Sequence, residues 1–490
     1  MAEESRESLE EIRLDKLKRI AELGIDPWGQ RFDAHQPISA VRELPLPDPS
    51  QADAVGPTVR VAGRIMLRRG QGKVVFLELR DWTGRIQIFI GKKQVGDDGW
   101  NLVDHLDLGD IIGVDGTLGL TKTGEITVFA TSLTFLSKSL APPPEKWHGL
   151  TDLEQRYRQR YVDLFSNPES LETFLGRSKI IATFRRLMID RGFVEVETPT
   201  MQAIAGGAAA RPFVTHHNTL GLDLFLRIAP ELYLKRLMVG GMERVFEIGR
   251  VYRNEGISPK HNPEFTMLEA YQAYGDYHSM MDLTESLICG SIEAIGGGYR
   301  RPWGEKTIDF TPPWPRRTYA ELLAEHAGVD PANYETIRAR AEGLGIKTAG
   351  RDPDVVTSDL FEELVEDRLV GPVFAIDYPA AICPLTKRKQ GNPRVAERFE
   401  LFVDGMELAN AYTELNDPAL QEQLFRSQLA GLAEEDSMAK MDDDFVRALK
   451  FAMPPAGGLG IGIDRLCMLL LNRQSIRDVI LFPLMRPQSG

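Results

Sequence analysis

The sequence predicts an α+β protein in which a small β-barrel precedes a larger domain of helices and strands. At 490 residues the chain is too long for one ordinary hydrophobic core, so it should hold two or three domains. Five short β-rich runs, separated by glycines and polar turns, lie between residues 58 and 140. From residue 156 to residue 490, helical patterns alternate with strand pairs and turns.

Proline-rich segments mark the expected domain boundaries. Residues 1–57 combine a charged helical pattern with a proline-rich linker, and residues 141–155 form a second proline-rich stretch that we interpret as a hinge. We therefore expect a barrel domain at 58–140 and a second domain at 156–490. Within the second domain, a charged and mostly helical insertion is predicted at about 317–370.

Charge is distributed unevenly along the chain. The formal net charge of −13 argues against a general affinity for nucleic acid. Residues 58–93, however, carry nine lysines and arginines against two acidic residues. This local excess predicts a nucleic-acid footprint on the barrel.

Cysteine usage and the N-terminal sequence predict a cytoplasmic protein. Cys289, Cys383 and Cys467 are widely spaced and form neither a C-x-x-C pair nor a disulfide framework, as expected of core residues in a reducing compartment. No apolar run approaches the length needed to cross a bilayer, and the N-terminus is too charged for a signal peptide. We expect no membrane partner.

The barrel segment has a candidate RNA-binding face. Five strands with a helix between the third and the fourth are the pattern of an OB-fold. If the turn at 81–84 has two or four loop residues, Phe76 lies on the same face as Gln87 and Phe89. An aromatic ring beside an amide suits single-stranded RNA, because the ring stacks on a base and the amide reads its edge. Alternatively both phenylalanines are barrel core, which is the stronger alternative for Phe89.

A long hairpin is predicted from residue 246 to residue 274. Apolar or aromatic side chains recur at every other position in both limbs, and the loop between them is rich in turn-forming residues. In the second strand Phe265, Glu269 and Tyr271 share one face, because side chains alternate between faces.

The tip of this hairpin carries groups that could grip a polyanion. Arg253 supplies a planar fork for a phosphate or carboxylate, His261 supplies a further donor, and Phe265 supplies an aromatic plane for a base. A solvated hairpin with a cation–π contact is an equal alternative on this segment alone.

Two further segments are typical of metal and nucleotide binding. Asp404-Gly405 is a strong hairpin signal, and pairing across it would put Glu400 and Glu407 diagonally on one face. Two converging carboxylates suit Mg²⁺, and they would repel each other without a cation. Alternating glycines at 458–462 leave one strand face without side chains, so a flat group could lie against the backbone.

Four segments resemble one known family. The R-N-E, H-N-P-E-F and M-L-E-A-Y elements of the 246–274 hairpin resemble motif 2 of the class II aminoacyl-tRNA synthetases, in the version carried by lysyl-tRNA synthetases. G-G-L-G-I-G-I-D-R at 457–465 resembles motif 3. The amphipathic segment 171–191 and the following strand, which ends at Pro199, resemble motif 1, which builds the family's homodimer interface. R-I-M-L-R-R-G-Q-G-K-V-V-F at 64–76 resembles the family's anticodon-binding barrel.

The resemblance covers nearly the whole chain and implies a class II catalytic domain with a mixed, mainly antiparallel sheet flanked by helices. It implies that L-lysine is activated with ATP to lysyl-adenylate, and that the lysyl group then passes to the 3′ end of tRNA(Lys) with release of AMP and pyrophosphate. Mg²⁺ is the implied metal. Because the carboxylate of lysine is ionised at neutral pH, the attack on ATP needs no general base. Positioning and charge neutralisation then supply the catalysis.

The resemblance also implies site residues, position by position. The implied ATP-binding residues are Arg253, Glu255, His261, Asn262, Phe265, Glu400 and Arg465. Among them Arg253, His261 and Arg465 are implied to be catalytic. The implied lysine-binding residues are Gly206, Glu231, Arg253, Glu269, Tyr271, Asn410, Tyr412 and Glu414. Glu400 and Glu407 are implied to hold Mg²⁺, and Arg68, Phe76 and Gln87 are implied to meet the anticodon.

One local conflict accompanies this assignment. Strict strand alternation puts Asn410 on the face opposite Glu407, although both are implied to serve one site. A β-bulge or a twist between the two residues is therefore expected.

Three functional alternatives are weighed against this assignment. An enzyme that attaches lysine to a protein would resemble the chain without its barrel. A non-catalytic RNA-binding relative would not need Arg253, Glu400, Glu407 and Arg465 together. A relative specific for aspartate or asparagine shares the architecture, but carboxylates in the pocket would repel an acidic substrate.

Overall fold

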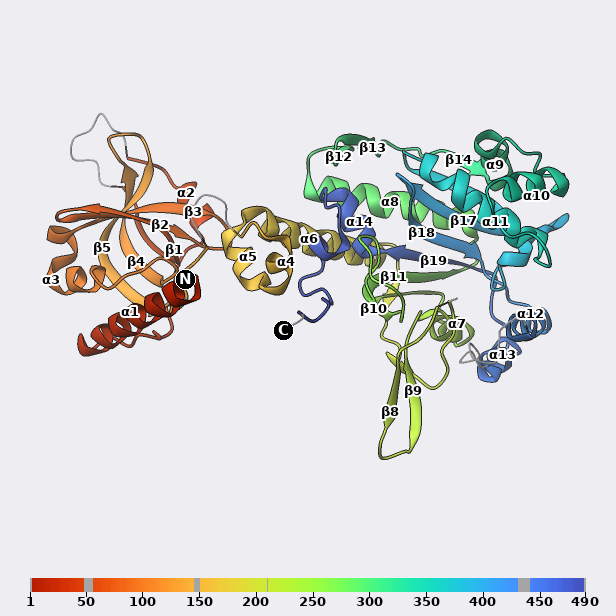
Figure 1. Ribbon diagram of the computed structural model, residues 1–490, viewed down its shortest axis with the longest axis horizontal. Coiled ribbons are helices and arrows are strands. Elements are labelled where there is room, and N and C mark those ends of the chain that lie inside the picture. The colour runs from red at the N-terminus through yellow and green to blue at the C-terminus, as the bar shows by residue number, and fades with distance from the viewer. Residues whose placement is uncertain (1, 48–55, 145–149, 209, 431–440, 489–490) are drawn as a thin grey trace. The chain divides into compact units, whose positions relative to one another are not determined.

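The computed structural model describes residues 2–47, 56–144, 150–208, 210–430 and 441–488 of the chain (Figure 1). Most of the predicted linker and the centre of the predicted hinge therefore lie outside the described residues. The chain forms two compact units, one made of Met1–Arg156 with Tyr161–Asn167 and the other of Tyr157–Arg160 with Pro168–Gly490. Within the described ranges, no helix combines the length and apolarity that a membrane span requires.

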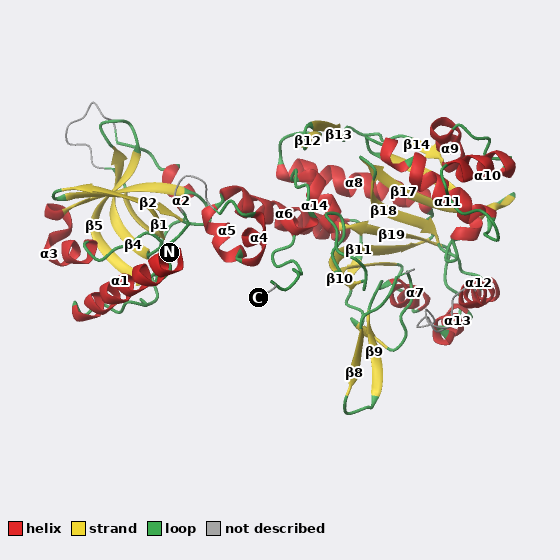
Figure 2. Ribbon diagram, in the orientation of Figure 1, coloured by secondary structure: helices red, strands yellow, loops and turns green. Residues whose placement is uncertain are grey.

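The first unit contains the predicted five-stranded barrel (Figure 2). Its strands close in the order β1-β2-β3-β5-β4, and buried residues such as Val61, Leu77 and Ile88 alternate along them to fill the interior. The strands are β1 Thr58–Gln71, β2 Val74–Arg80, β3 Arg85–Gly91, β4 Ile111–Leu120 and β5 Ile126–Ser137. The helices up to residue 166 are α1 Ala2–Glu22, α2 Ile38–Arg42, α3 Lys92–Val103, α4 Leu153–Arg158 and α5 Arg160–Ser166.

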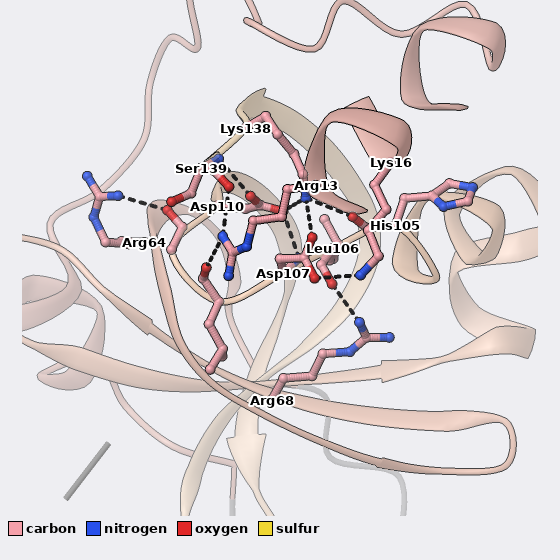
Figure 3. Close-up of polar contacts among 12 residues, drawn as sticks. Arg13, Lys16, Arg64, Arg68, His105, Leu106, Asp107, Asp110, Lys138 and Ser139 are labelled. Carbon is pink, nitrogen blue, oxygen red and sulfur yellow. Dashed lines mark hydrogen bonds and ion pairs between the residues drawn. The ribbon is translucent and has the colours of Figure 1, made fainter. Parts of the chain in front are cut away.

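A buried ionic network joins α1 to the barrel (Figure 3). Lys138 is fully buried, and its Nζ lies 2.7 Å from Asp107 Oδ2 and 2.8 Å from Asp110 Oδ2. Lys16 of α1 approaches the other oxygen of Asp107 at 2.5 Å. Arg13, also on α1, donates to backbone carbonyls of the barrel unit at 2.7 and 3.0 Å. The N-terminal helix is thus held by charge-assisted hydrogen bonds.

The second unit is built on a mixed, mainly antiparallel sheet, as predicted. Its order is β14-β15-β17-β18-β19-β11-β10-β6, with β16 paired to β17. Among the described strands of this sheet, only the pairs β14–β15 and β10–β6 at the two edges are parallel. The sheet strands are β6 Val194–Glu195, β10 Arg244–Tyr252, β11 Glu264–Ala273, β14 Arg316–Thr318, β15 Val373–Pro379, β16 Arg388–Lys389, β17 Asn392–Val403, β18 Met406–Thr413 and β19 Ala456–Gly462.

Two small sheets accompany the large one. They pair β12 with β13, and β9 with both β7 and β8. Their strands are β7 Met201–Gln202, β8 Val214–His217, β9 Leu222–Leu226, β12 Arg300–Trp303 and β13 Lys306–Asp309.

Helices cover one face of the large sheet. Buried residues of α6, α8 and α14 share a single hydrophobic core with Leu268 and Ala270 of β11. The helices of this unit are α6 Pro168–Asp190, α7 Glu231–Val239, α8 Tyr277–Ile295, α9 Tyr319–Ala327, α10 Tyr334–Gly343, α11 Pro353–Leu364, α12 Pro418–Ala430, α13 Asp443–Leu449, α14 Ile463–Leu470 and α15 Ile476–Val479, with short 3₁₀ turns at Glu366–Arg368 and Ala380–Ile382. The predicted insertion is mostly helical, because α9, α10 and α11 lie within it.

The buried lysine of the barrel gives a test of this architecture. Replacing Lys138 with methionine leaves the buried carboxylate of Asp110 without its cation, while Asp107 keeps Lys16, so the barrel should lose about 3–5 kcal/mol of unfolding free energy. Urea unfolding measures this loss, and hydrogen exchange at the barrel strands locates it in the barrel. Lys16→Met is the matched control and should cost about 1 kcal/mol or less, because Lys16 is partly exposed. Equal losses in the two variants would contradict the network.

Candidate active site

The face of the large sheet that α6, α8 and α14 leave free carries most of the predicted site residues. Leu268 and Ala270 point into the helical core, so Glu269 and Tyr271 project from the opposite face. Side chains on this face form two rows across the paired strands. One row runs through Glu269, Gly460, Asn410 and Glu400, and the next through Tyr271, Gly458, Tyr412 and Arg398.

A β-bulge brings the predicted metal ligands to this face. Asn410 pairs with Glu400 and Glu407 pairs with Phe402, which leaves Leu408 as an extra residue on β18. The hairpin turn at Asp404-Gly405 has positive φ at both residues, 48° and 67°. The β-bulge that was expected between Glu407 and Asn410 is therefore present.

The glycines of β19 make room for pocket side chains. A Cβ atom at Gly458 would lie 1.8 Å from Glu414 Oε1 and 2.6 Å from Tyr271 Cε1. At Gly462 a Cβ would meet only ordinary contacts, at 3.8 Å or more. The bare strand face was predicted to lie against a flat group, and at Gly458 the space is taken by Glu414 and Tyr271.

An ion cluster forms where the first turn of α7 meets the end of β18. Lys235 Nζ lies 2.6 Å from Glu231 Oε1 and is also paired with Glu414 Oε2. Glu414 and Lys235 are fully buried, and Glu231 is nearly so. Burial alone lowers the pKa of Lys235, but the carboxylates of Glu231 and Glu414 outweigh it and raise the pKa above its usual value. The ammonium therefore stays charged.

Two tyrosines and a third carboxylate complete the pocket. Tyr271 Oη donates to Glu269 Oε2 at 3.3 Å, and Tyr412 Oη donates to Glu231 Oε2 at 3.4 Å. Burial, reinforced by the neighbouring Glu231, raises the pKa of Glu269 to about 8. Gly206 packs beside this pocket, since a Cβ there would lie 2.8 Å from Leu232 at the start of α7.

The tip of the β10–β11 hairpin brings together the predicted catalytic residues. The Arg253 guanidinium lies 5.2 Å from the centre of the Phe265 ring. Arg465 Nη2 lies 3.1 Å from His261 Nε2, and its Nη1 donates to the Glu407 carbonyl at 3.0 Å. Because arginine can only donate, His261 Nε2 accepts. Burial, followed by the charge of Arg465, lowers the pKa of His261, so the imidazole is neutral.

The two remaining predicted ATP residues differ in their surroundings. Asn262 is buried, and its Nδ2 donates to the carbonyl of Glu264 at 2.6 Å, which fixes the start of β11. Its Oδ1 has no hydrogen-bond partner among the described residues. Glu255 is exposed at the hairpin tip.

The predicted metal ligands, Glu400 and Glu407, differ in their surroundings. Glu400 Oε2 accepts from Tyr378 Oη at 2.9 Å, and Oε1 pairs with Arg398. Burial raises the pKa of Glu407, and the charge of Glu400 adds to this effect. No group of three or more metal-ligating side chains occurs in the part of the chain that the structure describes. Mg²⁺ binding by Glu400 and Glu407 stays a prediction, in which phosphate and water supply the remaining ligands.

Arg398 and Lys235 were not among the residues predicted from sequence. Arg398 is largely buried, and its Nε donates to Asn410 Oδ1 at 3.2 Å while its guanidinium stacks over Tyr378 at 4.9 Å. Its position two residues before Glu400 on one strand was a usable signal. Lys235 follows Glu231 by four residues, so the two share a helix face.

The outer face of the barrel carries an aromatic cluster. Phe76 pairs with Phe89 across β2 and β3, and the two rings meet edge to face at 5.3 Å. Phe129 of β5 lies 5.3 Å from Phe89. All three rings are half-buried and lie outside the barrel core, so the core interpretation fails for Phe76 and for Phe89. Gln87 is on the same face and donates to Thr127 Oγ1 at 2.9 Å.

Arg68 lies apart from this cluster. The register pairs Arg68 with the buried Leu77, whereas the neighbouring Arg69 pairs with Phe76. The Arg68 guanidinium donates to the Leu106 carbonyl at 2.6 Å (Figure 3). The structure therefore does not bring Arg68 to the face of Phe76 and Gln87, and Arg69 takes that position.

Comparison with known families matches both units. Residues 152–486 match the class II (D, K and N) tRNA synthetases, and residues 59–136 match an OB-fold nucleic acid binding domain. The first match covers more than half of the chain.

Relatives are similar over the whole length of the chain. The lysine–tRNA ligase of Carboxydothermus hydrogenoformans is 51% identical over 485 residues, which cover 98% of each chain. That of Pelotomaculum thermopropionicum is 51% identical over 494 residues, covering 99% of this chain and 96% of the relative. That of Staphylococcus saprophyticus is 47% identical over 499 residues, covering 99% of this chain and 100% of the relative. The chain belongs to the lysine–tRNA ligase family of the class II (D, K and N) tRNA synthetases.

Proposed function

We propose that this protein activates L-lysine with ATP to lysyl-adenylate and transfers the lysyl group to the 3′ end of tRNA(Lys), releasing pyrophosphate and AMP. The observation that carries the proposal is the pocket of three buried carboxylates, Glu231, Glu269 and Glu414, beside the sheet face from which Asn410 and Glu400 project. An acidic pocket suits a substrate with two ammonium groups and repels an acidic one.

Lysine recognition follows from the surroundings of these carboxylates. Glu231 receives the α-ammonium, Glu414 receives the ε-ammonium, and Glu269 lines the space between them with Tyr271 and Tyr412. Asn410 and Arg253 hold the substrate carboxylate, and Gly206 closes the pocket beside α7. A substrate without the ε-ammonium leaves Glu414 buried and unpaired, which costs several kcal/mol.

ATP activation is assigned to the hairpin tip and its neighbours. Arg253 lies between the α-phosphate and the lysine carboxylate, Phe265 and Arg465 cover the adenine, and Glu255, His261 and Asn262 complete the nucleotide site. Glu400 and Glu407 would hold Mg²⁺, which neutralises phosphate charge when bound. The lysine carboxylate attacks the α-phosphate directly, so these residues orient and neutralise charge and remove no proton.

The barrel is assigned to the anticodon of tRNA(Lys). Phe76 stacks on a base and Gln87 reads a base edge, while Arg69 on the same face meets the backbone. Arg68 is not part of this face, because its guanidinium donates to the Leu106 carbonyl.

A homodimer in the cytoplasm is part of the same proposal. Leu175, Ile189 and Val194 are large apolar residues exposed on α6 and β6, the elements that resemble motif 1. A second copy would cover them. The three cysteines are buried and unpaired, as suits a reducing compartment.

Amino-acid-dependent ATP–pyrophosphate exchange tests the reaction. The full-length protein with Mg²⁺ and without tRNA should exchange label with lysine and with no other standard amino acid. Adding tRNA(Lys) should then yield lysyl-tRNA. Exchange that depends on aspartate or asparagine, or that fails with every amino acid, would remove the proposed activity.

Glu269 gives a pH prediction. Its raised pKa of about 8 means that the free pocket holds a proton below this pH, and a pocket that takes up two ammonium groups needs this carboxylate ionised to balance their charge. The kcat/KM for lysine in the exchange reaction should therefore rise from pH 6.5 to about 8 and then level off. The kcat/KM for ATP at saturating lysine serves as the control and should lack this step. A lysine profile that is flat over the same range would contradict the assignment.

Phe76 gives a prediction for tRNA. Phe76→Ala removes a stacking surface worth about 1–3 kcal/mol, so the KM for tRNA(Lys) should rise by about 10- to 100-fold. ATP–pyrophosphate exchange without tRNA should stay unchanged. Trp82→Ala is the matched control, because Trp82 is an exposed aromatic residue at the β2–β3 turn. An equal effect of both variants on the KM for tRNA would argue against the aromatic face.

A further inference from the structure

Lys235 is the only cation paired with the pocket carboxylates Glu231 and Glu414 among the described residues. It stands on α7 one turn after Glu231, and its side chain is completely buried. Its Nζ lies 2.6 Å from Glu231 Oε1, pairs with Glu414 Oε2 and lies 5.9 Å from the centre of the Tyr412 ring. One resident ammonium thus contacts the two carboxylates assigned to opposite ends of the substrate.

Each of these carboxylates keeps one oxygen directed away from Lys235. Among the described residues, the one hydrogen bond to Glu231 Oε2 is the long one from Tyr412 Oη at 3.4 Å. Glu414 Oε1 is buried and has no hydrogen-bond partner among the described residues. The absence of a side chain at Gly458 makes the room that this oxygen itself occupies, since a Cβ there would lie 1.8 Å from it. A buried carboxylate oxygen without a donor is costly unless a ligand supplies one.

The charges in the pocket explain why Glu414 Oε1 is left without a hydrogen-bond donor. Ionised Glu231, Glu269 and Glu414 carry three negative charges, and Lys235 offsets one of them. Two carboxylates remain unmatched, and lysine brings two ammonium groups. Its own carboxylate is matched by Arg253, so the occupied pocket is neutral. An amino acid with a single ammonium leaves one buried negative charge uncompensated.

We propose that Lys235 is a specificity-determining and positioning residue: it is a resident counter-ion that orients Glu231 and Glu414 and leaves two carboxylates for the two ammonium groups of lysine. The inference rests on the proposed function and adds to it a residue that need not touch the substrate.

The positions of Glu231 and Glu414 also determine how the loss of Lys235 changes the pocket. Glu231 and Glu414 both reach the same nitrogen, so they lie close together once that nitrogen is gone. Two buried carboxylates at such a distance do not both stay ionised. One of them takes a proton or turns away, and lysine then meets fewer correctly aimed acceptors. The loss should fall on lysine and spare ATP, since the hairpin tip does not contact Lys235.

Steady-state ATP–pyrophosphate exchange with Lys235→Met tests this. The KM for lysine should rise by about 100-fold, and the KM for ATP should stay within about twofold of wild type. Lys235→Arg keeps the charge and should recover most of the lysine affinity. Lys235→Gln keeps a donor without the charge and replaces the methionine variant if that variant fails a melting check. Lys138→Met is the matched control: it removes another buried lysine that bridges two carboxylates and should leave the KM for lysine unchanged.

The outcomes separate this inference from the proposed function. If the wild-type protein shows no lysine-dependent exchange, the proposed function itself fails. If the wild type exchanges with lysine but a folded Lys235→Met or Lys235→Gln variant keeps a KM for lysine within about threefold of wild type, the role of Lys235 is wrong. A parallel rise of the KM for lysine and ATP in these variants would also overturn it, because it indicates a structural role only.

Discussion

Carboxylates that are buried away from water must be matched by cations or hydrogen-bond donors, and this constraint shapes the catalytic unit. Glu231 of α7, Glu269 of β11 and Glu414 after β18 are distant in sequence, yet all three are buried in one pocket, where Lys235 pairs with Glu231 and Glu414. The missing side chain at Gly458 and the hydroxyls of Tyr271 and Tyr412 serve the same pocket. A folded pocket with unmatched carboxylates is prepared for a dicationic substrate.

The same sheet face joins the proposed amino-acid pocket to the proposed nucleotide site. Alternation on β18 would separate Asn410 from Glu407, and the extra residue Leu408 restores both to one face. Arg398 then links Asn410 to Glu400 through its guanidinium. Arg465 connects the hairpin tip to the bulge by contacting His261 and the Glu407 carbonyl. The substrate carboxylate and the α-phosphate can therefore be aligned by groups whose own positions are fixed by hydrogen bonds.

Local patterns predicted most of the fold and much of the site. The β10–β11 hairpin and the Asp404-Gly405 turn follow from period and turn chemistry within one segment, whereas the bulge on β18 was expected only because the family resemblance implied one site for Glu407 and Asn410. Lys235 and Arg398 were missed because their partners lie on other segments, and only the pairing of distant strands and helices reveals them. Arg68 was grouped with Phe76 by the family resemblance, whereas the register places Arg69 beside Phe76. Counting residues within a strand could not fix a register that depends on the partner strand.

Ligand-induced stabilisation of the wild-type protein tests the central claim most directly. Thermal melting with saturating L-lysine is compared with melting in the same concentration of L-norleucine, which has the same chain length but no ε-ammonium. Lysine should raise the melting temperature by several degrees and norleucine should give little or no shift, because only lysine matches both remaining carboxylates. Equal shifts with the two amino acids would contradict a pocket selected by its charge balance.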